Sequence, residues 1–273
     1  MDSDNKPTYR PVKTNPEWIP GIYQYCDRWC ERCDFTSRCK SFALEFGQPQ
    51  EEAHMSAQEK KRHDRSSRQF SNELEEAFWT ERDRYQEKEK DWNEALNDQE
   101  WDRQHPHNKA LEQEVSAHPV ATAAWKYSAL AERWLKINEE LLSGKMIQLE
   151  TKVKLAAGAQ RAETEMELIS DALATIRWYE PQIWVKLMRA LTGMNRETSP
   201  GPKDSDGSAK VALIGIDRSL AAWGQLQFLI PELTDDFITL LLALDRLRNK
   251  TEAAFPHARA FRRKGFDEEV TTP

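Results

Sequence analysis

The feature that most constrains this 273-residue chain is the clustering of its cysteines, because all four lie within fourteen consecutive positions. Cysteines this close in sequence indicate one metal site. A structural zinc site usually has two C-x2-C pairs separated by a longer span, whereas a single loop around a [4Fe-4S] cube supplies thiolates at gaps of two or three residues. The spacing here, C-x3-C-x2-C-x5-C, therefore favours a [4Fe-4S] cluster, with Zn²⁺ as the alternative and reduced thiols or two disulfides as the remaining interpretation. The expected ligands are Cys26, Cys30, Cys33 and Cys39.

The residues after Cys39 have the pattern of a short helix. Phe42 and Phe46 follow at helical spacing, and Gly47 and Pro49 mark its end. We expect the phenylalanines to share one face with Cys39 and to press the bound group against apolar packing. The loop itself is expected to shield the other side with its own aromatic side chains, which are Tyr23, Tyr25, Trp29 and Phe35.

The segment CERCDFTSRCKSFALE, residues 30–45, resembles the cluster-binding segment of WhiB-like iron–sulfur regulators. The same cysteine triplet is similar to the cluster loops of endonuclease III type DNA glycosylases and of RecB-family nucleases that carry an iron–sulfur centre. The resemblance implies a [4Fe-4S] cluster and extends no further along the chain. Asp34 stands where these families often have proline, and the WhiB-like Gly-Trp-Gly-Gly turn and basic tail are missing, so their activities are not carried over.

The first three cysteines also have the C-x3-C-x2-C spacing of radical S-adenosylmethionine enzymes, which leave one iron open for their cofactor. Arg32 replaces the aromatic residue that usually precedes the third cysteine of that motif, and Cys39 is available to fill the open position. No βα repeat follows in the sequence. We therefore do not expect this chemistry.

Composition predicts an all-α fold. Charged residues make up 31% of the chain, only 10 of 273 residues are glycine, and alternating β-branched residues are almost absent. A formal net charge of −7 disfavours a general nucleic-acid binder, and no stretch approaches the roughly 18 to 20 apolar residues that span a bilayer. The first residues lack the apolar region of a signal peptide, so we expect a cytoplasmic protein in which thiolates stay available for metal.

We predict two parts, an extended arm with the cysteine segment at residues 1–48 and a helical bundle at 49–273, with a linker at about 193–207. Helical periodicity predicts helices at about 66–104, 119–143, 145–191, 208–230 and 235–255. Gly158 and Pro181 are possible breaks in the third of them. The basic tail, residues 256–266, is expected to dock on an acidic face or a partner. The residues expected to face inward include Val120, Tyr127, Leu130, Trp134, Leu141, Ile147, Ile169, Leu173, Ile176, Ile183, Leu187 and Leu191.

Charged residues interrupt the apolar runs of the last two predicted helices. Asp217 and Asp245 lie in these runs, while Arg177, Glu163 and Glu167 lie on a partner helix. Charges inside apolar runs are unfavourable unless they are paired. The sequence therefore predicts either a buried Asp/Arg network or a carboxylate-lined site between the helices.

Three functions follow from these features as alternatives. The first is a redox- or oxygen-responsive regulator, or an electron-transfer accessory, whose cluster state changes how the protein meets a protein partner. The second is a zinc-stapled interaction module, in which the metal only fastens the arm to the bundle. The third is an enzyme with a carboxylate-lined site in the bundle.

Overall fold

The computed structural model describes residues 17–46, 114–155, 158–194 and 203–267. Across these residues the chain is helical and contains no strand, which confirms the all-α prediction. The predicted helix at 66–104 lies outside them. None of the described helices is long and apolar enough to cross a membrane.

The described residues fall into two compact units. The cysteine unit contains residues 17–46 together with residues 263–267, and the helical unit contains the described residues from 114 to 262. Each unit is described by itself.

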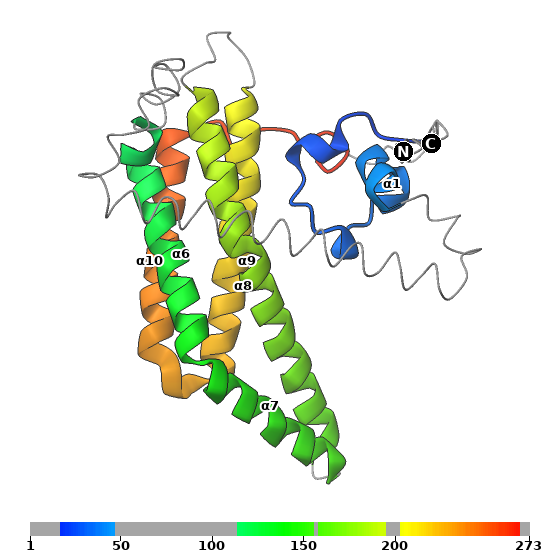
Figure 1. Cartoon of the computed structure of the whole chain (residues 1–273), viewed down its shortest axis with the longest axis vertical. Helices are drawn as coiled ribbons and strands as arrows, with labels where there is room; N and C mark the ends of the chain where they lie inside the picture. The colour runs from blue at the N-terminus through cyan, green and yellow to red at the C-terminus, as the bar shows by residue number, and fades with distance from the viewer. Residues whose placement is uncertain (1–16, 47–113, 156–157, 195–202, 268–273) are drawn as a thin grey trace, which may run out of the picture. The chain divides into compact units, whose positions relative to one another are not determined.

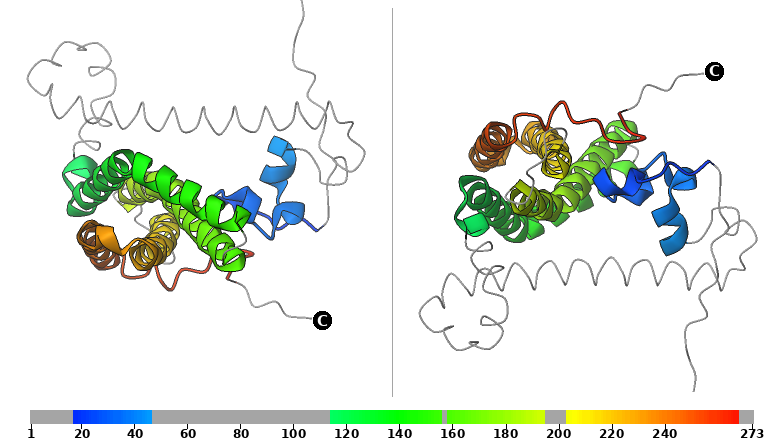
Figure 2. Two further views of the ribbon diagram at one scale, coloured as in Figure 1. Left: turned by 90° about the horizontal axis from the view of Figure 1, so that it is seen from below. Right: turned by 90° about the horizontal axis from the view of Figure 1, so that it is seen from above.

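In the helical unit, α6, α8, α9 and α10 pack as a closed ring. Helix α8 packs against α6 and α9, and α10 packs against the same two helices, so each member of the ring has two neighbours. Neighbouring helices run antiparallel, and α7 continues from the end of α6 and packs against α8 (Figures 1 and 2). The bounds are α6, Pro119–Ile137; α7, Glu139–Lys154; α8, Ala159–Met194; α9, Asp204–Leu229; and α10, Thr234–Ala254. A short 3-10 helix, η4 (Pro231–Leu233), joins α9 to α10.

The helix ends explain where the sequence prediction was wrong. The helix expected to reach residue 143 stops at Ile137, because the Asn138 side chain donates a hydrogen bond of 3.0 Å to the Trp134 carbonyl and α7 starts a new direction. Gly158, in the left-handed region at φ 72°, precedes α8, whereas Pro181 lies inside α8 without ending it. Residues 204–207 of the expected linker are the first turn of α9.

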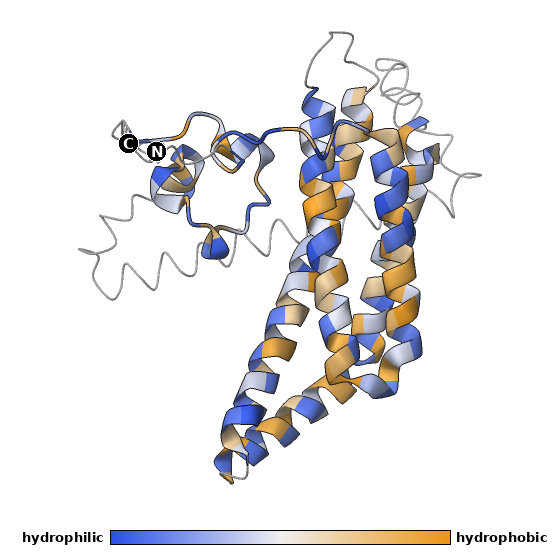
Figure 3. Ribbon diagram, turned by 180° about the vertical axis from the view of Figure 1, so that it is seen from behind, coloured by the Kyte–Doolittle hydropathy of each residue, from blue (hydrophilic) through white to orange (hydrophobic). Residues whose placement is uncertain are grey.

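The core of the helical unit is aromatic. The rings of Trp134 and Trp223 meet edge to face at 5.0 Å, and Phe237 lies 5.1 Å from Trp134. The buried Tyr127 hydroxyl accepts a hydrogen bond of 3.1 Å from the Trp223 indole. Apolar residues lie along the facing sides of the helices (Figure 3). Most of the residues predicted to face inward are buried, but Leu130, Leu141 and Ile147 are exposed.

The cysteine unit consists of short turns. Three 3-10 helices, η1 (Ile22–Tyr25), η2 (Cys30–Arg32) and η3 (Thr36–Arg38), precede α1 (Lys40–Phe46). The chain before the loop joins the end of η3 through the Ile19 amide, which donates a hydrogen bond of 3.0 Å to the Arg38 carbonyl. The turn formed by residues 263–267 completes the unit.

Candidate metal centre

The cysteines lie at the ends of the three 3-10 helices. Cys26 follows η1, Cys30 begins η2 and Cys33 follows it, and Cys39 follows η3 and directly precedes α1. Each turn reverses the chain, and the amides of Cys33 and Cys39 close their turns with hydrogen bonds of 3.2 Å each to the carbonyls of Cys30 and Thr36. Successive short turns therefore bring side chains that are close in sequence around one space.

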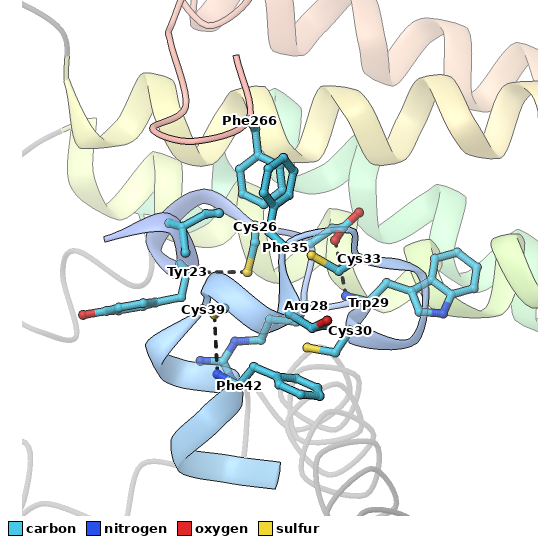
Figure 4. A pocket seen from close by; sticks show the side chains of 13 residues that line it. Tyr23, Cys26, Arg28, Trp29, Cys30, Cys33, Phe35, Cys39, Phe42 and Phe266 are labelled. Carbon is cyan, nitrogen blue, oxygen red and sulfur yellow. Dashed lines mark hydrogen bonds between the residues drawn. The ribbon is translucent and has the colours of Figure 1, made fainter. Parts of the chain in front are cut away.

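All four cysteines line the same cavity (Figure 4). Its empty volume is about 320 Å³, including the open mouth. The thiols are free of disulfides, and each cysteine is partly exposed. The four cysteines thus border one common space.

Aromatic rings form much of the wall. Tyr23, Trp29 and Phe35 line the cavity as expected from the sequence, but Tyr25 is not part of the lining. Phe42 of α1 also lines it, and its ring centroid lies 4.9 Å from that of Phe46, as the helical spacing predicted. The thiols are therefore enclosed mainly by apolar surface.

Two of the sulfur atoms have backbone partners. The Cys26 thiol donates to the Tyr23 carbonyl at 3.4 Å, and the Phe42 amide donates to the Cys39 sulfur, also at 3.4 Å. Hydrogen bonds to ligand sulfur are one of the factors that set the potential of an iron–sulfur centre. The first turn of α1 thus supplies such a donor to Cys39.

The thiols influence one another electrostatically. Burial, together with the nearby Cys26 and Cys33, raises the pKa of Cys30 to about 12. Burial also raises the pKa of Cys33; a backbone hydrogen bond from Phe35 opposes the shift, and Cys26, Asp27 and Cys39 add to it. Thiols that disfavour one another's ionisation are each favoured as thiolates by a shared cation, so a metal bound among them would release protons.

Four thiols are a ligand set that suits Zn²⁺ or an iron–sulfur cluster. A tetrahedral zinc site, with Zn–S distances of about 2.3 Å, draws its four sulfur atoms to within about 4 Å of one another. Within the described ranges, no three His, Cys, Asp or Glu side chains are close enough to hold a single ion. The four cysteines border one cavity, and binding of either zinc or a cluster would require their side chains to adjust around it.

Arg28 is the unusual residue of the loop. Its φ is 57°, in the left-handed region that non-glycine residues seldom occupy, and its carbonyl accepts a hydrogen bond of 2.9 Å from the Cys30 amide. Its side chain lines the cavity, as does that of Asp27, whose carboxylate accepts a hydrogen bond of 3.3 Å from the Trp29 amide. One cation and one anion therefore accompany the four sulfur atoms.

One lining residue comes from the other end of the chain, and sequence reasoning missed it. Phe266 lines the cavity together with the cysteines, and its ring packs edge to face against Phe35 at 5.1 Å. The basic tail was expected to dock on an acidic face or a partner, and its Arg259 does pair with Asp217 and Glu252. The available signal was a single aromatic residue after Gly265, and no spacing links it to the cysteines.

The residues proposed for a carboxylate-lined site do not form one. Asp217 pairs with Arg259 at 2.5 Å, and Asp245 pairs with Arg248 at 2.5 Å. These four side chains are roughly 35 to 44% exposed, so the predicted burial of the Asp/Arg network is wrong. The helix-borne Glu163, Glu167 and Arg177 are exposed.

No family model matches the chain, and comparison with curated proteins and with solved structures finds no match. The resemblance of residues 30–45 to iron–sulfur segments therefore rests on those residues alone. Function has to be argued from the geometry of the cysteine cavity.

Proposed function

We propose that the four cysteines bind a [4Fe-4S] cluster and that the protein acts as a redox- or oxygen-responsive regulator or an electron-transfer accessory for a protein partner. The observation that carries the proposal is the convergence of all four cysteines on one cavity with apolar walls. Their chemistry supports it, because four thiols are the usual ligand set of such a cluster.

The chain's own residues give such a group its environment. When bound, a [4Fe-4S] cluster supplies one-electron chemistry. Trp29, Phe35 and Phe42 place apolar rings at the cavity wall, the Phe42 amide donates to the Cys39 sulfur, and Arg28 places a positive charge at the wall. The hydrogen bond and the positive charge favour the more negatively charged, reduced state of a bound cluster, whereas the low dielectric of the aromatic wall opposes it.

The carboxylate-lined enzyme is not proposed. The two aspartates that suggested it, Asp217 and Asp245, are held by arginines at 2.5 Å and lie partly exposed. Carboxylates neutralised in this way are poorly placed to bind a cation or to move a proton.

Metal analysis tests the proposal most directly. Anaerobically purified protein is expected to be brown, with absorption near about 400 nm and comparable amounts of iron and acid-labile sulfide. Cys33→Ala should lose both, whereas Leu44→Ala, an exposed position on α1, should keep them. Colourless protein with about one zinc per chain would instead support the zinc-stapled interaction module, and protein without metal would reject both.

Redox titration separates the two modes of action. A reversible spectral change on reduction, with iron retained, is expected of an electron-transfer accessory. Loss of iron and sulfide in air, together with a change in binding to a partner, is expected of an oxygen-responsive regulator. A cluster that neither cycles nor responds to air would reject both modes and leave a structural role.

A further inference from the structure

We propose that Phe266 and the turn that carries it, residues 263–267, form a cover over the cysteine cavity that limits the access of water and oxygen to the bound group. This inference rests on the proposed cluster for its biological meaning. The cover itself is a property of the chain and can be tested without a cluster.

The position of Phe266 is the first line of support. Its side chain lines the same cavity as the four cysteines and, with Phe35, forms one wall of it (Figure 4). The two ring centroids are 5.1 Å apart with an interplanar angle of 74°, an edge-to-face contact of the kind that aromatic pairs prefer. Truncation of Phe266 removes apolar wall at the site and leaves the four ligands in place.

The turn is braced by its own side chains. The Asp267 carboxylate accepts hydrogen bonds from the Arg263 amide at 2.9 Å and from its guanidinium at 3.1 and 3.2 Å. The same guanidinium lies 4.8 Å from the centre of the Phe266 ring. The Phe266 amide closes the turn with a bond of 3.1 Å to the Arg263 carbonyl. The ring is thus held by Arg263 of its own segment and by Phe35 of the cysteine loop.

Gly265 fixes the turn against the chain before the first cysteine. Its φ is 83°, and a Cβ atom there would lie 2.9 Å from Cγ2 of Ile19 and 3.0 Å from Cδ1 of Ile22. Ile22 is buried, so it has little room to yield. The backbone therefore approaches this surface so closely that only glycine fits, and that approach sets the place of Phe266.

The apolar shell around a metal site controls solvent access and local dielectric, and therefore the stability and potential of the bound group. In the cysteine unit this shell is thin, because each thiol is already partly exposed. Loss of one aromatic ring therefore removes a large fraction of this apolar shell. The cover should accordingly slow attack on the site by small reagents.

The first experiment measures thiol alkylation by iodoacetamide in reduced, metal-free, full-length protein at one fixed pH. Phe266→Ala and Gly265→Ala are expected to react faster than wild type, on the order of tenfold. The matched control is Phe228→Ala, the same change at a side chain of the helical unit that is 83% exposed, and it should react as wild type does. Circular dichroism and thermal melts show whether each variant is folded at the assay temperature.

The second experiment follows the loss of cluster absorption in air for anaerobically purified protein. Phe266→Ala should bleach faster than wild type, and Phe266→Leu, which keeps most of the apolar volume, should lie between them. If Phe266→Ala does not fold, Phe266→Leu is compared with wild type alone in both assays. A rate above that of wild type supports the cover, and a rate equal to that of wild type overturns it.

The outcomes distinguish the two proposals. If wild-type protein contains iron and sulfide but all variants alkylate and bleach at its rate, the cover is wrong and the cluster stands. If wild-type protein contains no iron, the proposed cluster fails, while faster alkylation of the Phe266 and Gly265 variants still supports a cover over the cavity.

Discussion

The two units achieve stability in different ways. The helical unit buries a large set of apolar side chains around Trp134, Trp223 and Phe237, whereas the buried hydrophobic residues of the described cysteine unit are Ile22 and Ala43. With so few buried apolar side chains among its described residues, this unit would gain stability from a bound metal, as small natural domains usually do from a metal or disulfides. The comparison predicts that the cysteine unit depends on a group bound in its cavity, while the helical unit relies on its core.

The largest expected effect comes from removal of that group. Chelation of the metal, or Cys33→Ala, should lower the free energy of unfolding of the cysteine unit without abolishing its fold, because metal-binding free energy adds to folding free energy in such units. Hydrogen exchange should then lose protection in residues 17–46 and keep it in α6, α8, α9 and α10. Unchanged protection in residues 17–46 would mean that the cysteine unit is stable without a bound group. The proposed difference between the two units would then be wrong.

The converse change is Trp223→Ala in the helical core. Deletion of this fully buried ring should lower the free energy of unfolding of the helical unit by about 3 to 5 kcal/mol. Denaturant unfolding followed by circular dichroism measures the loss, and the iron content should stay at the wild-type value. The exposed Phe228→Ala is the control and should change the stability by less than about 0.5 kcal/mol.

A smaller effect is expected at Arg28, where charge and backbone conformation can be separated. Arg28→Ala and Arg28→Gly both remove the positive charge at the cavity, so both should shift the cluster potential to more negative values by a similar amount. Only glycine relieves the left-handed conformation, so Arg28→Gly should be the more stable of the two by about 1 kcal/mol. Spectroelectrochemical titration and thermal melts check these expectations, and different potentials for the two variants would contradict them.

The smallest effect concerns His118, whose Nδ1 accepts the Val120 amide at 3.2 Å and caps α6. Burial, and then the charge of Lys250, lower the pKa of His118 in the folded state. Its neutral form is therefore favoured on folding, and this contribution to stability is full above about pH 6.5, the unfolded value, and is lost as the pH falls through and below it. Unfolding free energies measured across this range should fall less in His118→Asn, which keeps a capping side chain without a titrating group. An identical pH profile in both proteins would exclude His118 as its source.

The sequence predicted what depends on short spacings. The 3.6-residue period predicted most of the helices and most of the buried residues. The cysteine spacing predicted that the four cysteines lie together, and they line one cavity. The errors lie where a single local contact outweighs the period, as at Asn138, or where apolar residues such as Ile147 occupy the right phase on a helix that packs on one side alone. These outcomes depend on neighbours that a periodic pattern does not specify.

Contacts between residues far apart in the sequence could not be predicted, for a different reason. Asp217 and Arg259 are 42 residues apart, and nothing in either segment indicates the other. The same holds for Phe266 and Phe35, which come from opposite ends of the described chain. Partners of this kind are fixed only when the fold is complete.

The placement of Phe266 sets an order of events during synthesis. Almost the entire described chain separates this residue from the last cysteine, so a ribosome has to translate the helices before it can release the final piece of the cavity wall. The four cysteines are synthesised before Phe266, so their thiols lack this part of the cavity wall until residue 266 has been translated. A metal delivered before residue 266 has been translated would therefore reach a cavity that lacks this wall. A metal delivered later would meet a cavity that Phe266 covers on that side.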